Sequence, residues 1–315
     1  MAVVIAPNFR YIQKVPLPPT PNPLGPLSDL VGKWEGSGFN QIWRPFHDTA
    51  NPAQDRFLEL NETNETLEFT EISGPVPNRG LLQPDINLFG ITYLQQISDA
   101  VTSGGLHIEP GIWVNVPVTT NPAEPATVAR MASIPHGTTI NLQGNGIGPI
   151  NSGPVFTPVS IDPFPIGGGA PIVFPEKNLS APTPFRSPPA DIPDVTQAMV
   201  DNPNSVLAAA VAGLQISNMF VLRVSSAITN LPTMPPPMPP PGSGGGTANI
   251  AFLAGGAPGN APNANAATVT ATFWIMTVTR PGDPPFQLLQ YTQTVLLNFN
   301  RLSWPHVSVA TLRKF

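Results

Sequence analysis

Apolar and polar residues alternate over short stretches along most of the chain, and Gly, Pro, Asn or Asp separates one stretch from the next. Alternation with a period of two, in segments rich in Ile, Val, Thr and aromatic residues, predicts β-strands that bury one face. Residues 61–64 are either a turn between two strands or part of one long strand. The predicted strands are 31–44, 55–61, 66–72, 86–98, 105–118, 126–134, a short strand ending near Leu142, 215–226, 248–254, 267–279, 286–299 and 302–314.

One helix is predicted, at 203–213. Asp201 or Asn202 can cap its start, Pro203 lies near the first helical position, and Gly213 can end it. Roughly ten strands and one short helix indicate an all-β fold. We expect an antiparallel, lipocalin-like barrel, because closure of the sheet leaves no exposed edge. A β-sandwich is the alternative.

Proline and glycine mark the segments that interrupt this pattern. The chain has 43 prolines and 27 glycines in 315 residues. The first prolines predict an extended N-terminal arm over 1–29, followed by a single barrel domain over 30–315. Gly and Pro recur through 143–202, which indicates a long, irregular insertion. A second insertion, 231–247, has a proline-rich half and a glycine-rich half, and is either a spacer or a segment that docks on an aromatic groove.

The composition excludes several classes of function. No cysteine is present, so disulfides, thiolate metal sites and cysteine nucleophiles are excluded. The net charge is -5 and lysine is scarce, which argues against a nucleic-acid-binding protein. No apolar run approaches the ~20 residues that span a bilayer, and no convincing signal peptide is seen, so we expect a cytoplasmic protein. Only 10% of the residues are charged. This is consistent either with an uncharged polar surface or with burial against other copies of the chain.

His306 stands out among the four histidines. The alternation of its strand puts Leu302, Trp304, His306, Ser308, Ala310 and Leu312 on one face. That face is apolar except for the imidazole and one small hydroxyl. In a barrel, His306 would point inward beside free space, where it could be the axial ligand of a flat apolar cofactor such as haem. The alternative is a core histidine that bonds to a backbone carbonyl.

Two further sites hold histidine. His136 occupies a predicted turn between two strands, where it either meets water or faces the open side of a bound haem. Arg44 or Arg130 could then meet a haem propionate. His107 and Glu109 share one strand face, as an ion pair or as part of a pocket lining. The acidic residues between 55 and 71 are interpreted as a solvated strand face, and no catalytic carboxylate pair, P-loop or G-x-S-x-G motif is present.

The first and last strands carry a resemblance to a known family. The segment Gly32-Lys33-Trp34-Glu35-Gly36-Ser37-Gly38 is similar to the opening motif of nitrobindins and the related fatty-acid-binding-protein-like β-barrels. The final strand, with His306 and the basic pair Arg313-Lys314, resembles the nitrobindin strand that supplies the haem-binding histidine. The resemblance implies haem b as the cofactor and His306 as the iron ligand. If haem binds, His136 is the candidate in the sequence for a distal acid–base residue, and Trp34, Phe39 and Trp43 would be part of the apolar lining.

Three functions follow as hypotheses. The first is a haem-binding barrel, peroxidase-like or binding peroxide, oxygen or nitric oxide at the free iron position. The second is a carrier of an apolar small molecule such as a fatty acid, with Arg44, Arg130 or Arg223 meeting its carboxylate. The third is a self-assembling structural subunit, a homo-oligomer whose proline-rich arms wrap neighbouring copies.

Overall fold

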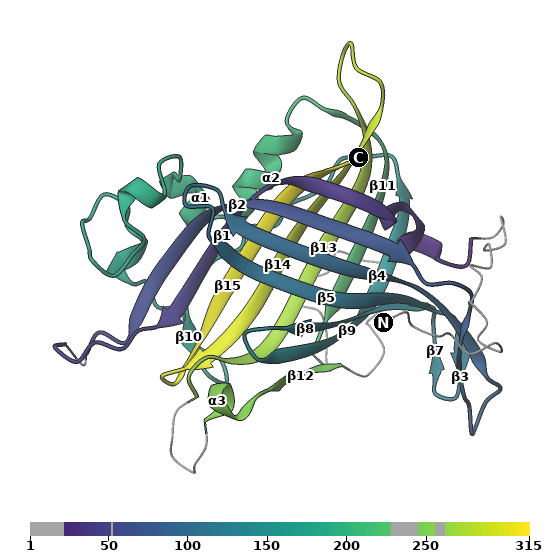
Figure 1. Cartoon of the computed structure of the whole chain (residues 1–315), viewed down its shortest axis with the longest axis horizontal. Helices are drawn as coiled ribbons and strands as arrows, with labels where there is room; N and C mark the ends of the chain where they lie inside the picture. The colour runs from purple at the N-terminus through teal and green to yellow at the C-terminus, as the bar shows by residue number, and fades with distance from the viewer. Residues whose placement is uncertain (1–21, 52, 228–244, 256–261) are drawn as a thin grey trace, which may run out of the picture.

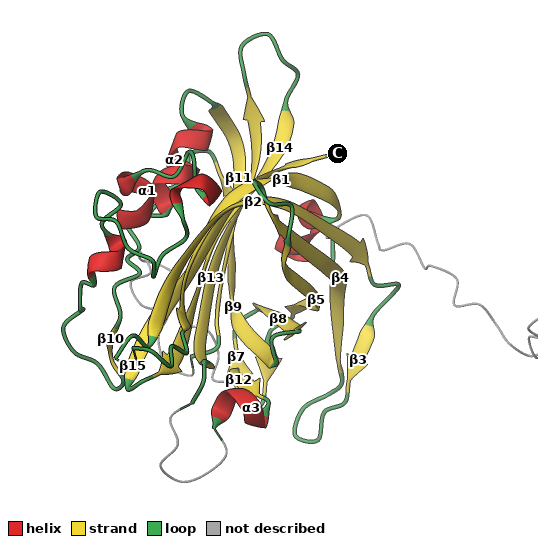
Figure 2. Cartoon of the chain, turned by 60° about the vertical axis from the view of Figure 1, so that its left-hand side comes forward, coloured by secondary structure: helices red, strands yellow, loops and turns green. Residues whose placement is uncertain are grey.

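Ten long antiparallel strands form one closed barrel (Figures 1 and 2). The structure is a computed structural model that describes residues 22–51, 53–227, 245–255 and 262–315. The first and last strands pair, from Trp34 opposite Lys314 to Gln41 opposite Val307, and so close the sheet. The expected all-β antiparallel barrel is confirmed. In order around the wall the strands are β1 (Gly32–Pro45), β2 (Arg56–Glu71), β4 (Ile86–Asp99), β5 (Gly105–Val116), β8 (Thr127–Ile134), β9 (Thr138–Ile150), β11 (Gln215–Ser225), β13 (Asn265–Thr279), β14 (Phe286–Phe299) and β15 (Leu302–Lys314).

The remaining elements are short. They are β3 (Val76–Asn78), β6 (Thr119–Thr120), β7 (Ala123–Glu124), β10 (Phe164–Pro165), β12 (Gly246–Asn249), the 3-10 helices η1 (Gly25–Leu30), η2 (Pro175–Lys177) and η3 (Pro189–Asp191), and the α-helices α1 (Gln197–Asp201), α2 (Asn204–Val211) and α3 (Ala251–Ala254). The predicted helix at 203–213 corresponds to α2. Residues 61–64 belong to the single long strand β2. The strand predicted at 248–254 is wrong beyond residue 249, where α3 follows β12.

Glycines bring β1 close to β15 where the barrel closes. A Cβ atom added at Gly36 would overlap the carbonyl oxygen of Thr311, and one at Gly38 would overlap that of Val309. Both glycines point into the barrel, between Trp34 and the cavity described below. The glycines of the opening motif therefore have a structural role, since only a residue without a side chain fits this approach of two strands.

The helix η1 closes one end of the barrel. Leu27 and Leu30 are fully buried among the interior side chains, together with Trp34. The indole N–H of Trp34 donates a hydrogen bond to the carbonyl of Leu30 at 2.7 Å. Residues 22–29, predicted as part of an arm, are thus part of the barrel domain. The rest of the predicted arm, 1–21, lies outside the described residues.

A second hydrophobic core lies outside the barrel wall. The segment 151–214 between β9 and β11 packs its apolar side chains on the outer face of β1, β2, β11, β13, β14 and β15. Figure 2 shows α1 and α2 beside this face. Trp43 donates from its indole N–H to the carbonyl of Ile161 at 3.0 Å, and the side chain of Gln290 donates to the carbonyl of Leu207 at 3.0 Å. Six barrel strands therefore bury apolar side chains on both faces.

The predicted insertions are only partly as expected. The first begins later than 143, because β9 continues to Ile150, and the remainder forms the cover of the second core. Of the predicted insertion at 231–247, residues 231–244 lie outside the described residues, and 246–247 begin β12. Within the described ranges, each helix is too short or too polar to cross a bilayer.

Candidate functional site

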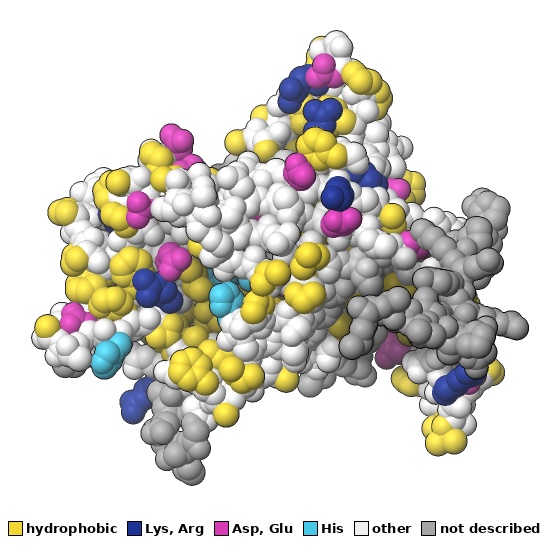
Figure 3. Space-filling model, viewed as in Figure 1, with side chains coloured by type: hydrophobic (Ala, Val, Ile, Leu, Met, Phe, Trp, Pro, Cys, Tyr) yellow, Lys and Arg dark blue, Asp and Glu magenta, His cyan; other side chains and the backbone are white. Residues whose placement is uncertain are grey.

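A cavity of about 450 Å³ lies inside the barrel, toward the end opposite η1. It is bordered by the end of β1, the start of β2, the β8–β9 turn, the β14–β15 end and α3. Its volume is within the usual range for small-molecule pockets. Hydrophobic side chains gather around a histidine on the face seen in Figure 3. The apolar lining is Ile42, Ile97, Leu106, Ile134, Phe252, Leu253, Ala264, Ala266, Val269, Val295 and Leu297, and the polar lining is Asn40, Arg44, Glu59, Gln95, His107, His136, Thr138, Tyr291, Gln293, His306 and Ser308.

His306 lies on the cavity wall as part of a small polar group. Its Nε2 is 2.7 Å from Oδ1 of Asn40 on the neighbouring strand. The hydroxyl of Ser308 donates to the same Oδ1 at 2.8 Å. Burial, with a smaller contribution from the nearby His107 and His136, lowers the pKa of His306 to about 3. The imidazole is therefore neutral near pH 7, and its hydrogen bond goes to a side-chain amide instead of a backbone carbonyl.

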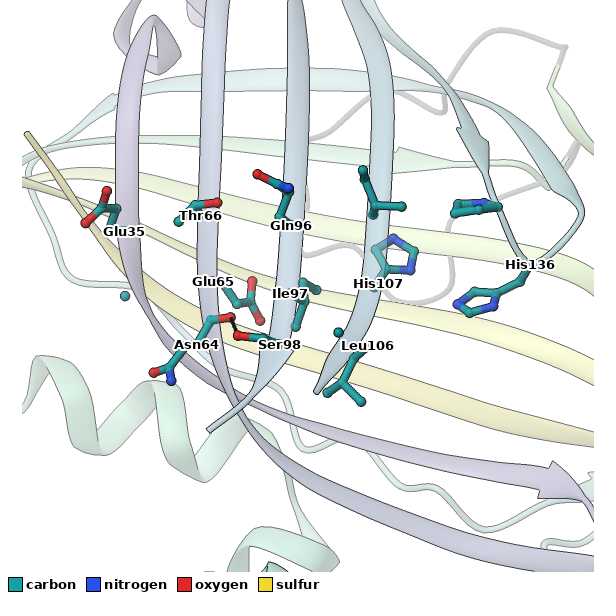
Figure 4. A pocket seen from close by; sticks show the side chains of 14 residues that line it. Glu35, Asn64, Glu65, Thr66, Gln96, Ile97, Ser98, Leu106, His107 and His136 are labelled. Carbon is teal, nitrogen blue, oxygen red and sulfur yellow. Dashed lines mark hydrogen bonds between the residues drawn. The ribbon is translucent and has the colours of Figure 1, made fainter. Parts of the chain in front are cut away.

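His107 and His136 meet on the opposite side of the cavity. They come from β5 and from the turn after β8, and their ring centroids are 5.9 Å apart (Figure 4). Burial and the neighbouring His107 lower the pKa of His136. Gly137 follows with φ of +106° and donates to the carbonyl of Ile134 at 2.9 Å, which makes the predicted turn. Both histidines also border a second, more open depression of about 800 Å³ over β1, β2 and β4.

A fully buried ion pair lies behind His107. The guanidinium of Arg130 contacts the carboxylate of Glu109, and also donates to the hydroxyl of Tyr93 at 2.8 Å and to Gln293 at 2.7 Å. His107 Nε2 is 3.2 Å from the second oxygen of Glu109. Burial would raise the pKa of Glu109, but the charge of Arg130 and the hydrogen bonds from His107 and Tyr93 lower it to about 2. The pair predicted for His107 and Glu109 is therefore present, with Arg130 as a third member.

Glu65 is a second buried carboxyl group, on β2. It accepts hydrogen bonds from Tyr291 at 2.6 Å, Thr63 at 3.0 Å and Gln95 at 3.3 Å, all from uncharged donors. Burial raises the pKa of Glu65, and the three hydrogen bonds offset only part of this effect. Tyr291 and Gln95 line the cavity and bond to this carboxyl group, so polar side chains extend from the cavity further into the barrel interior.

The other predicted site residues are divided between the two cores. Trp34 is inside the barrel but beneath the cavity, against η1. Phe39 and Trp43 lie outside the wall, in the second core, since the inward positions of β1 are the even-numbered ones. They do not line the cavity. Arg44 does line it, and its Nε is 2.8 Å from a carboxylate oxygen of Glu59.

The last strand needs one further correction. Alternation holds from His306 to Leu312. The inward-facing residues of this stretch are His306, Ser308, Ala310 and Leu312. Trp304 belongs instead to the second core, where its ring stacks on Phe299 with a centroid distance of 4.7 Å. The predicted single face of β15 is thus divided at Pro305. Within the described ranges, no group of three or more His, Asp or Glu side chains is arranged to hold a metal ion.

Comparison with known proteins gives a remote likeness in structure alone. No protein-family model matches the chain, and no curated protein matches it. The crystal structure of Rv2717c from M. tuberculosis is similar over 95% of this chain and 99% of that chain, with a TM-score of 0.43 and 14% sequence identity. The barrel of the present chain is established by its own strand pairing.

Sequence reasoning missed several polar residues of the interior. Asn40, Gln95 and Tyr291 line the cavity, and Glu65 lies behind two of them. The acidic stretch was interpreted as a solvated face, and Glu65 corrects this, because it is only 3% exposed. Alternation along β2 could have predicted this, because Glu65 is two residues from Leu67 and therefore shares its inward face.

Proposed function

We propose that the protein binds a small, mostly apolar molecule inside its barrel. The observation that carries this proposal is the 450 Å³ cavity, whose lining combines apolar side chains with hydrogen-bonding groups. Such a lining is typical of small-molecule sites, in which apolar contacts supply affinity and a few polar groups fix orientation. The cavity borders α3 and the ends of several strands.

A cavity-filling variant tests this proposal. Ile42 points into the cavity, and Ile42→Trp should occupy the space and reduce binding of the uncharged fluorescent dye Nile red by at least about tenfold. Dye fluorescence titrated with protein gives the affinity. The matched control is Leu94→Trp, at a 39% exposed position on the wall that faces away from the cavity. Equal dye binding by both variants would show that the dye is held elsewhere.

Haem is a second candidate ligand, favoured by one observation. The imidazole of His306 is neutral and lies on the cavity wall, and neutral imidazole is the form that ligates iron. His306 would hold the iron. Asn40 would orient the imidazole ring through its hydrogen bond to Nε2, provided that the other ring nitrogen is the iron ligand. Bound haem would supply an iron position that is open to a gas or peroxide. Nε2 must leave Asn40 if it is the ligating atom.

Hemin titration tests the second candidate. If His306 ligates haem, adding hemin gives a sharp Soret band that His306→Ala removes, because the imidazole is the only nitrogen ligand that β15 contributes to the cavity lining. His47→Ala is the control, since His47 is exposed in the loop between β1 and β2. A Soret band that survives His306→Ala unchanged refutes this assignment and leaves the proposal of an apolar ligand intact.

A further inference from the structure

The cations near the cavity already have carboxylate partners. Arg44 pairs with Glu59 at 2.8 Å on the cavity wall. Arg130 points into the barrel interior without lining the cavity, is 2% exposed and pairs with Glu109. His107 also contacts Glu109, at 3.2 Å. Among the described residues that line or support the cavity, positive charge is therefore matched by negative charge.

One further carboxyl group near the cavity, Glu65, has no basic side chain among its hydrogen-bond donors. Glu65 is buried behind Gln95 and Tyr291, and its recorded partners are uncharged side chains. An added carboxylate inside the barrel would lose its hydration without gaining a free cation, and it would lie near this buried carboxyl. Removing a charge from water without a partner is strongly unfavourable.

The polar residues that line the cavity include several neutral hydrogen-bonding groups. Asn40 and Ser308 flank the neutral imidazole of His306, and Gln95 and Tyr291 form the next part of the wall. Amides, hydroxyls and imidazoles both donate and accept hydrogen bonds. An alcohol, ketone or amide can bond to these groups and lose far less hydration than an ion does.

We infer that the cavity selects an amphipathic ligand whose buried polar group is uncharged, and discriminates against fatty-acid carboxylates. This inference rests on the proposed function and names the ligand class of the same site. The inference concerns only the part of the ligand that is buried inside the barrel. It makes no statement about a ligand carboxylate that remains in water at the cavity mouth. A fatty acid held inside the barrel by Arg44 or Arg130 is disfavoured by this inference, because both guanidinium groups already pair with carboxylates.

The test compares two molecules that differ in head group only. Decanol and decanoic acid are titrated into the full chain at neutral pH, where the acid is ionised, and heats of binding are recorded. We expect decanol to bind at least about tenfold more tightly, because the carboxylate must be desolvated without a cation. Equal or tighter binding of decanoic acid overturns the inference. Absence of binding by both molecules, together with absence of Nile red binding, overturns the proposed function and the inference with it.

Two variants separate charge from other causes. Glu59→Gln removes the partner of Arg44 and leaves a guanidinium free on the cavity wall, so the preference for decanol over the acid should fall by about tenfold or reverse. Glu59 is part-exposed at 29%, so the variant should still fold. Glu68→Gln is the control, because it removes the same charge from the outer face, where Glu68 lies 3.6 Å from Lys33. An equal change in both variants would mean that net charge, and not the pairing of Arg44, sets the preference, and would overturn the inference.

Discussion

Arg130→Met is expected to lower the free energy of unfolding by about 3 to 5 kcal/mol, because it leaves the carboxylate of Glu109 buried without a countercharge. Glu109 is fully buried, so water cannot replace the guanidinium. The substitution also removes the hydrogen bonds from Arg130 to Tyr93 and Gln293. Urea denaturation followed by tryptophan fluorescence gives the unfolding free energies of the two proteins.

A double variant distinguishes the lost charge from lost packing. Adding Glu109→Leu to Arg130→Met removes both charges, and a buried ion pair that is replaced by apolar residues often costs little stability. We therefore expect the double variant to recover much of the loss. If the double variant is as unstable as Arg130→Met alone, the packing of the long side chain is the larger contribution, and the electrostatic account of this pair fails.

Gly36→Ala should destabilise the barrel by about 3 kcal/mol, at the upper end of the range for over-packing. The added Cβ would overlap the main chain of β15 at Thr311, and a backbone atom cannot move aside as the end of a side chain can. The two strands that close the barrel would have to separate at this point. The midpoint and slope of urea unfolding measure the effect.

The control for Gly36→Ala is the same substitution on an open strand. Gly105 begins β5, and nothing lies within 4 Å of a Cβ atom built there. We expect Gly105→Ala to change the stability by less than about 0.5 kcal/mol. If both variants lose a similar amount of stability, the cause is the general difference between alanine and glycine, and not the close approach of the two strands that close the barrel.

Strand-forming residues bounded by turn residues predicted the position of most barrel strands, including strands that are buried on both faces. Segments 86–98, 267–279, 286–299 and 302–314 were placed within a few residues of β4, β13, β14 and β15. Where a strand is buried on both faces, the pattern did not show which side chains face the barrel interior and which face the second core. On β1, alternation alone could not tell that Phe39 faces the second core and Asn40 the cavity, since the cover from 151–214 is far away in the sequence.

The sequence predicted only those residues of the candidate site that stand out within their own strand. His306 stands out because it is polar on an otherwise apolar face, and His107 and Glu109 because they share one strand face. All three point inward. The partners that decide their chemistry come from other strands. Asn40 is on β1 and Arg130 on β8, and their register against β15 and β5 follows from tertiary pairing, which local patterns do not encode.

The cover on one side of the barrel makes its stiffness uneven. A displacement of β1, β13 or β15 disturbs close packing on two faces, whereas β4, β5 and β8 expose apolar outer residues such as Leu94, Ile112 and Met131 to water. Close-packed interiors resist deformation, so elastic distortion is concentrated on the uncovered strands. His107 and His136 belong to this side. The histidine pair therefore sits on the compliant wall, and His306 sits on the rigid one.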